Sequence, residues 1–326
     1  MIRFLTALAL VAASPATAVS PDTAPYEGLR ELDTRLARIA YRLVTANVAL
    51  CREQQPVLGL TLHAIDQYPA ADATAVRQVF GFPAPVAVEL VVPGGPAAAA
   101  GVRADDGVTA IDGVALPVPA PSGDVTAATR DAAQARLAAV APGTPVALSL
   151  RRGSIAQVAS VRPVAGCRAE FEVLATTKLG ASSDGRVVQV GAPLFLRFDD
   201  EQIAVVVAHE LAHTILRHRI RLEAAGVKWG LLAQFGRNAR LFRETETEAD
   251  VLGAFLLRNA GWDAQAAVRF WRTQGAKIDG GMFHSRTHPS AKDRAATIER
   301  ALAAMPAAAP IPYAPAILAQ RDAPLQ

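Results

Sequence analysis

Two histidines and a glutamate lie within five positions of the apolar segment "AVVVAHELAHTILRHR". His209 and His213 are four residues apart, so on a helix both imidazoles project from one face and can bind the same metal ion. Glu210 directly follows the first histidine and can reach a water molecule on that ion. The simpler alternative is a pair of buried core histidines. The spacing favours two zinc ligands with an adjacent general base.

A third ligand is needed, because a catalytic zinc ion has three protein ligands and one open position. The segment "ETETEAD" crowds carboxylates into a predicted helix over residues 238–259. Glu246 and Asp250 share a face of that helix, and the apolar residues around Asp250 favour a core-facing side over a solvated acidic face. We expect Glu246 to be the ligand and Asp250 to orient a ligand histidine. Glu248 is the less favoured ligand, expected to point elsewhere, and Glu244 is expected to be exposed.

Three segments together resemble a known peptidase family: "VVAHELAHTILRH", "RETETEADVLGAFLLRNAGWD" and "THPSAKDR". They are similar to the HtpX-like and CAAX-prenyl-protease-type zinc metallopeptidases, in which HExxH is followed by ExxxD and by a late His-Pro with a downstream arginine. The resemblance covers roughly residues 168–300. It implies a gluzincin domain with one zinc ion per chain on His209, His213 and Glu246, and with Glu210 catalytic.

The late histidine is interpreted through the same resemblance. His288 matches the family's His-Pro, which implies that it donates to the transition-state oxyanion or occupies the open zinc position in a resting state. Without the resemblance, a surface-loop histidine is the simpler interpretation. Arg294 is expected to anchor the same loop. His218 and His63 have no partner pattern and are expected to be structural or exposed.

The strand ahead of the zinc helix is expected to bind substrate. An extended peptide can add to an exposed strand edge through main-chain hydrogen bonds, and "GRVVQV" is the natural edge. We therefore expect unfolded or flexible polypeptides as substrates. The residues predicted to contact them are Arg186, Val187, Val188, Gln189 and Val190.

Two further elements must position this site. Apolar residues recur at helical spacing from Tyr26 to Leu50, which predicts an amphipathic helix that packs on the catalytic domain. The zinc helix is expected to open at Asp199 or Asp200, with the latter as N-cap. These features divide the chain into an N-terminal helical segment (19–55), a zinc domain (165–305) and a proline-rich, mostly irregular tail (306–326).

Residues 56–164 are rich in Pro, Gly and Ala and resemble a bacterial PDZ domain. "VLGL" matches the carboxylate-binding loop, and "VVPGGPAAAAGVRADDGVTAIDG" matches the small-residue helix and the following strand. A low-complexity linker is the alternative, but strand-like alternation in three stretches argues against it. The resemblance implies recognition of a peptide C-terminus or an apolar peptide by backbone amides around Leu58, Gly59 and Leu60.

Cys51 and Cys167 stand just outside the two ends of this module. Because the ends of a PDZ domain emerge close together, the module can be an insertion and the two cysteines can meet. We expect them to form a disulfide, which an oxidising compartment would permit. Two buried free thiols are the alternative.

The first residues suggest export. Arg3, an apolar stretch from Phe4 to Ala13 and small residues at Ala16 and Ala18 have the layout of a cleaved signal peptide over residues 1–18. We expect an exported, periplasmic protein without an integral membrane segment in the mature chain. The formal charge of +3 and the scattered arginines argue against a nucleic-acid partner.

The sequence thus predicts an α+β protein, with a mostly helical gluzincin domain, a small β-sheet and an inserted PDZ-like β-rich module. The predicted function is a zinc-dependent endopeptidase of the envelope quality-control type. The alternative is a proteolytically silent, zinc-containing chaperone or scaffold that acts through the module. Glu210 argues against that alternative, because a purely structural zinc site needs no general base. A hydrolase of small molecules is disfavoured by the peptide-binding module.

Overall fold

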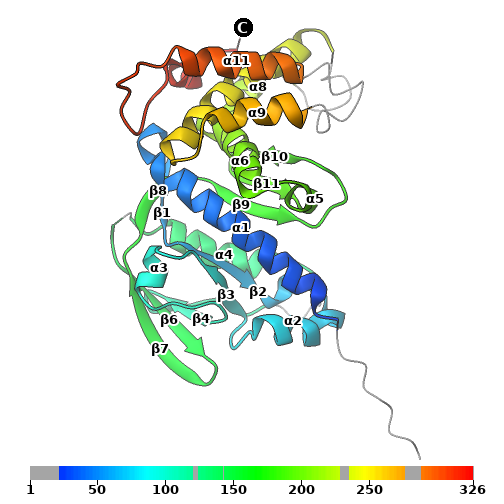
Figure 1. The fold of residues 1–326 in the computed structure, drawn as a ribbon. Coiled ribbons are helices and arrows are strands. Elements are labelled where there is room, and N and C mark those ends of the chain that lie inside the picture. Colours follow the sequence, from blue (N-terminus) through cyan, green and yellow to red (C-terminus); the bar gives the residue numbers. More distant parts are fainter. Residues whose placement is uncertain (1–21, 120–123, 142, 228–234, 276–287, 326) are drawn as a thin grey trace, which may run out of the picture.

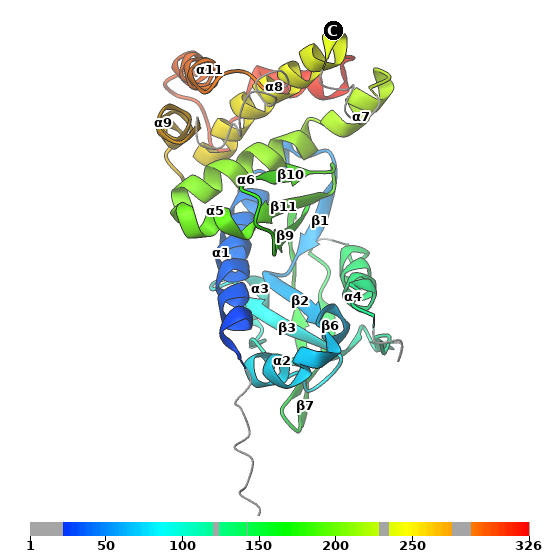
Figure 2. The same ribbon diagram turned by 90° about the vertical axis from the view of Figure 1, so that its right-hand side faces the viewer.

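The computed structural model describes residues 22–119, 124–141, 143–227, 235–275 and 288–325. It confirms the α+β class. Helices gather at one end and a six-stranded sheet at the other, and the long helix α1 (Ala24–Ala46) runs along both (Figures 1 and 2). The predicted signal peptide lies outside the described residues. Within them, no helix combines the length and the apolar character needed to cross a bilayer.

Two long helices form the centre of the helical region. Helix α6 (Asp200–Ile215) packs against α8 (Gly236–Asn259) within the larger hydrophobic core. That core also takes in the buried face of α1 through Leu36, Ile39 and Leu43. The remaining helices here are α5 (Ala192–Arg197), α7 (His218–Ala224), α9 (Gln265–Thr273) and α11 (Ala291–Ala303), with short 3-10 turns η1 (Val48–Leu50) and η6 (Ala316–Asp322).

The start of α6 is fixed by a reciprocal cap. The Asp199 side chain accepts from the Gln202 amide at 2.9 Å, and the Gln202 side chain accepts from the Asp199 amide. Asp199 is therefore the N-cap, and the expectation that Asp200 has this role is wrong. Asp200 instead lies in the first turn, where its charge favours the positive end of the helix dipole.

A three-stranded sheet lies against α6 in the order β10 (Ala181–Ser183), β11 (Val187–Gly191) and β9 (Glu170–Leu174). Strand β11 pairs antiparallel with β10 and parallel with β9. The prediction that residues 186–190 form an open edge is therefore wrong, because β11 is the central strand. Its buried valines suit that position, and the edge next to α6 is the short strand β10.

The second region has its own hydrophobic core. Its sheet runs β2-β3-β4-β6-β7, with β5 paired to β4, so β2 and β7 are the edges. The strands are β2 (Leu60–Ala64), β3 (Val86–Val91), β4 (Gly107–Ile111), β5 (Val114–Ala115), β6 (Val146–Arg152) and β7 (Ile155–Val161). The helices are α2 (Ala73–Phe80), α3 (Pro96–Ala99) and α4 (Ala128–Ala138), with 3-10 turns η2 (Ile65–Gln67) and η3 (Ala70–Asp72).

A two-stranded stalk connects this sheet module, residues 58–163, to the helical region. Strand β1 (Gln54–Val57) pairs antiparallel with β8 (Val164–Cys167), so the chain leaves and returns at adjacent positions. The structure joins Cys51 and Cys167 in a disulfide at the base of the stalk, with their Cα atoms 5.3 Å apart. The two cysteines lie in the core of the helical region.

Helix α1 also contacts the sheet module through a pair of buried carboxyl groups. Asp33 on α1 is hydrogen-bonded to Glu89 on β3. Burial raises the pKa of Asp33 to about 6, in spite of that hydrogen bond and the nearby Arg130. Burial and the neighbouring Asp33 raise the pKa of Glu89 well above its ordinary value. This joint therefore favours a proton held between the two groups.

Candidate metal centre

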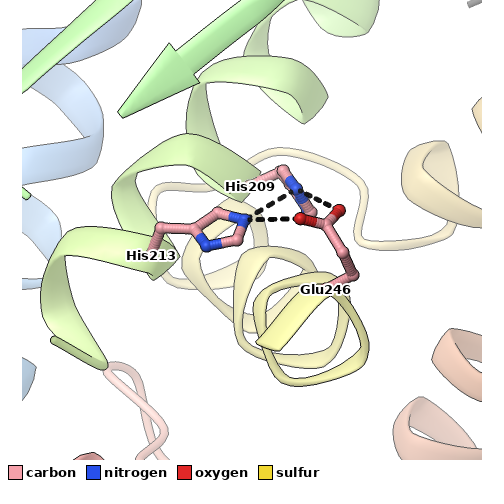
Figure 3. A group of neighbouring side chains, drawn as sticks. All are labelled: His209, His213 and Glu246. Carbon is pink, nitrogen blue, oxygen red and sulfur yellow. Dashed lines mark hydrogen bonds and ion pairs between the residues drawn. The ribbon is translucent and has the colours of Figure 1, made fainter. Parts of the chain in front are cut away.

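Three potential ligands converge between α6 and α8. Figure 3 shows His209 and His213 on one helix pointing toward Glu246 on the other. His209 Nε2 lies 3.1 Å from His213 Nε2 and 3.3 Å from Glu246 Oε2. His213 Nε2 lies 3.4 Å from Glu246 Oε1. One ligand atom from each residue falls within 4.8 Å of the other two, which makes this a group able to surround one metal ion.

Gly253 lets the two helices approach each other at this point. A Cβ atom at this position would lie 3.2 Å from the His209 amide nitrogen and 3.3 Å from its Cα. A side chain would push α8 away from the first ligand. The glycine one turn after Asp250 is thus part of the geometry that brings Glu246 to the histidines.

His209 is held from behind by an aspartate and an arginine. Asp250 Oδ1 lies 3.1 Å from His209 Nδ1, so Asp250 is placed to orient this imidazole, as its spacing indicated. Arg294 donates to both carboxylate oxygens of Asp250 at 2.7 Å. Its guanidinium also lies 3.4 Å from Glu246 Oε2 and 3.5 Å from the centre of the Trp271 ring.

Arg294 lies in the first turns of α11 and is 3% exposed. The expectation that it also anchors the loop of His288 concerns residues before His288 that lie outside the described part of the chain, so it stays a prediction. Helix α11 itself was not predicted from the sequence. A signal for the helix was present, because Ser290 caps it by accepting from the Asp293 amide at 3.2 Å.

His213 is held by a longer chain of buried groups that the sequence analysis did not find. Its Nδ1 lies 2.8 Å from Nδ1 of His218, and His218 Nε2 lies 2.9 Å from Glu248 Oε2. Arg221 donates to both oxygens of Glu248. Glu248 does point away from the three ligands, but it is buried and reaches one of them through His218. A substitution of Glu248 is therefore expected to affect His213, even though Glu248 is not one of the three potential ligands.

The charges around the centre suit a cation. Burial opposes ionisation of Glu246, but His209, His213 and Arg294 hold its pKa well below the ordinary value. Burial lowers the pKa of His213. Burial alone would do the same at His209, whereas its hydrogen bonds to Asp250 and Glu246 raise that pKa to about 10. The surroundings that favour a proton there would equally favour a metal ion.

Glu210 and His288 complete the group. Glu210 is buried beside the ligands on α6, and burial raises its pKa to about 7. A carboxyl with that pKa can both accept and return a proton near neutral pH. His288 Nε2 lies 3.5 Å from Glu246 Oε2, and its side chain is 31% exposed. The structure thus places this histidine next to the three ligands and open to solvent.

The predicted substrate-binding residues lie in two places. Residues 187–190 form the centre of the small sheet beside α6. Leu58, Gly59 and Leu60 lie in the turn from β1 to β2 and line a cavity of ≈ 190 Å³ between α1, α4 and β9. The structure does not bring this turn to the three ligands (Figure 1).

Comparison with known proteins relates the part of the chain that contains this site to peptidases. Residues 178–302 match the model of Peptidase family M48, and the three potential ligands, Glu210, His288 and Arg294 fall in that span. A curated relative is the mitochondrial metalloendopeptidase OMA1 of Schizosaccharomyces pombe, which is 30% identical over 121 residues. That alignment covers 31% of this chain and 36% of the relative, so the chain spans about a third of the relative's length. Both matches support a metalloendopeptidase.

Proposed function

We propose that this chain is a zinc-dependent endopeptidase that cleaves unfolded or flexible polypeptides. The observation that carries the proposal is the convergence of His209, His213 and Glu246 beside the buried Glu210. Two imidazoles and a carboxylate form a common catalytic zinc set, with a fourth position left for water or substrate. The donor atoms fit zinc, and the family match is to peptidases.

The proposed reaction assigns each side chain a task. A zinc ion held by His209, His213 and Glu246 would polarise the scissile carbonyl and lower the pKa of a water molecule. Glu210 accepts the proton of the attacking water and delivers it to the leaving amine. His288, whose Nε2 lies 3.5 Å from Glu246 Oε2, is proposed to donate a hydrogen bond to the developing oxyanion or to occupy the open zinc position in a resting state. Asp250 and Arg294 keep His209 and Glu246 in place.

Strand β10 takes over the proposed role of the substrate-binding edge. It is an edge strand of the small sheet, and Ser183 Oγ lies 3.0 Å from Thr214 Oγ1, one residue after His213. An extended peptide added to this edge would run beside the ligand helix. The peptide main chain would supply most of the binding, which suits segments without stable structure of their own.

The sheet module is proposed to be PDZ-like and to select polypeptides. Strand β2 is an edge, α4 packs beside it, and residues of both line the cavity of ≈ 190 Å³, which we propose as the groove where a peptide adds as a further strand. Leu58, Gly59 and Leu60 line the cavity near the end of that groove. This arrangement supports recognition of a peptide C-terminus or an apolar segment. Export to a periplasm and a role in envelope quality control remain proposals that rest on residues 1–18 and on the resemblance.

Metal analysis and a casein-cleavage assay test the proposed function. Purified protein should contain about one zinc ion per chain, and chelation should abolish cleavage. Glu210→Gln should keep the zinc and reduce cleavage at least about a hundredfold, since it removes the general base. If Glu210→Gln cleaves as fast as the parent protein, the endopeptidase proposal is wrong. A zinc-loaded parent that binds polypeptides without cleaving them would instead favour the silent scaffold.

A further inference from the structure

We propose that the segment of residues 316–325 positions the metal ligand His213, through a continuous chain of contacts made by Arg221, Glu248 and His218. The inference rests on the metal centre of the proposed function. It adds a control element that lies outside the matched residues 178–302. Its members act on the centre through their contacts with His213, so they are positioning residues.

The inner part of the chain fixes the orientation of one imidazole. If the Nε2 atom of His213 faces the metal, its Nδ1 carries the hydrogen and donates to His218 Nδ1, at 2.8 Å. His218 must then carry its hydrogen on Nε2, which donates to Glu248 Oε2 at 2.9 Å. Every donor in this arrangement has one acceptor, so only one orientation of each ring satisfies it.

Arg221 connects this inner part to the segment 316–325. Its two terminal nitrogens donate to the two oxygens of Glu248, and its Nε donates to the main-chain oxygen of Ala323 at 2.9 Å. His218, Arg221 and Glu248 are 1%, 6% and 6% exposed. A guanidinium buried to this extent needs its acceptors. Loss of the Ala323 contact would leave Nε unpaired and admit water beside Glu248.

Further contacts hold the segment against the helical region. Asp322 accepts from Arg217 at 2.8 Å and from Arg52 at 2.6 Å, and Arg321 donates to the Leu50 carbonyl at 3.1 Å. Leu325 is 6% exposed in a small apolar cluster with Leu222, Val227 and Leu241. The segment thus bridges α7 and the 3-10 turn that precedes Cys51. Ile317 and Leu318 of the segment also pack, partly buried, against the larger core, so a variant without the segment needs a check of its folding.

Deletion of residues 316–326 tests the inference. Zinc affinity would be measured by competition with a chromophoric chelator, and coordination geometry by the visible spectrum of the cobalt-substituted protein. We expect affinity to fall about tenfold, the scale of losing a partner of a metal ligand, and the cobalt bands to shift. A synthetic peptide of the sequence AILAQRDAPLQ should restore both, whereas a scrambled peptide should not. Circular dichroism would check that the deleted protein is folded.

Two point variants on α7 provide a matched pair. Arg221→Met removes the link and should weaken zinc binding about tenfold. Arg219→Met removes an exposed arginine that pairs with Glu223 on the same helix and should leave zinc affinity unchanged. Unchanged affinity and cobalt spectrum in Arg221→Met and in the folded deletion variant would overturn the inference while leaving the peptidase proposal intact. A parent protein that binds no zinc would overturn both.

Discussion

Two groups of carboxyl side chains, one at the metal centre and one between α1 and the sheet module, differ in their surroundings. At the metal centre, Glu246, Glu248 and Asp250 each contact a histidine and an arginine, which hold their pKa values below the ordinary range despite burial. At the joint between α1 and the sheet module, Asp33 and Glu89 contact each other, and burial raises both pKa values. Glu246, Glu248 and Asp250 thus stay negatively charged near neutral pH, whereas the raised pKa values of Asp33 and Glu89 favour the protonated forms.

The difference in pKa indicates that the first region favours a metal ion and the second a shared proton. Anionic carboxylates fixed by neighbouring cations preserve an electrostatic field that favours a metal ion, whatever the pH near neutrality. A carboxyl pair that shares a proton holds two parts of the chain together only while the proton is present. The metal centre should therefore respond strongly to the loss of a charge, and the joint should respond to pH.

The largest expected effect is the loss of the anionic ligand. Glu246→Gln keeps the shape of the side chain but removes its charge and its strength as a ligand. Zinc affinity should fall at least about a hundredfold, more than the loss of an outer partner would cause, together with peptide hydrolysis. Chelator competition measures the affinity. Glu244→Gln, two residues earlier on the same helix, is the control, and the ligand assignment fails if this variant loses the metal while Glu246→Gln retains it.

A smaller loss of zinc affinity is expected when Asp250, the partner of His209, is changed. Asp250→Asn leaves a group that can still accept from His209 but removes the charge that Arg294 neutralises. We expect zinc affinity to fall between about tenfold and a hundredfold, and the melting temperature to fall because Arg294 stays buried without a full counter-charge. Equal zinc affinity in parent and variant would show that the buried charge at this position is not needed for the metal.

The contact between Asp33 and Glu89 should change the pH dependence of stability rather than zinc binding. Because the folded-state pKa of Asp33 is raised from 3.8 to about 6, its contribution to stability is full below about pH 4 and is lost as pH rises through 6. Asp33→Asn should therefore raise the melting temperature at pH 8 relative to the parent and reduce the difference between pH 5 and pH 8. Glu31→Gln on the exposed face of α1 is the matched control. An identical pH profile for parent and Asp33→Asn would contradict the proposed proton-dependent joint.

The smallest effect on zinc is expected from removing the sheet module. Val57 and Val164 are paired across the stalk, so an Asn-Gly turn can replace residues 58–163 and close β1 and β8 into a hairpin. All proposed ligands remain, and bound zinc should be unchanged while the rate or preference of polypeptide cleavage changes. Zinc loss in the shortened protein would mean that the two regions fold as one unit.

The elements that could be predicted are those with a local signal. Helical periodicity in α1, the spacing of His209, Glu210 and His213, and the carboxylates of α8 depend on near neighbours in the sequence. Strand β10 has three residues and no apolar alternation. Its pairing with β11 depends on the tertiary fold, so the edge was assigned to the wrong strand.

The partners behind the ligands show the same limit. Asp250 could be placed because it lies one turn from Glu246 on the same helix. His218 and Arg221 lie on α7, and their contacts with Glu248 span 30 and 27 positions of the chain. They also depend on the direction in which the chain leaves α6, where Arg217 at the start of α7 has a left-handed backbone conformation with φ 55°. No spacing rule links such residues.

The disulfide at the base of the stalk has a consequence for any proteolytic cut in the sheet module. A cut anywhere between Leu58 and Pro163 leaves the two resulting fragments tied together by Cys51 and Cys167, which flank every such cut. A nicked molecule would migrate as one species on a gel without reductant and as two with it. Damage to the exposed loops of the module would thus not release the first helix from the core that it helps to build.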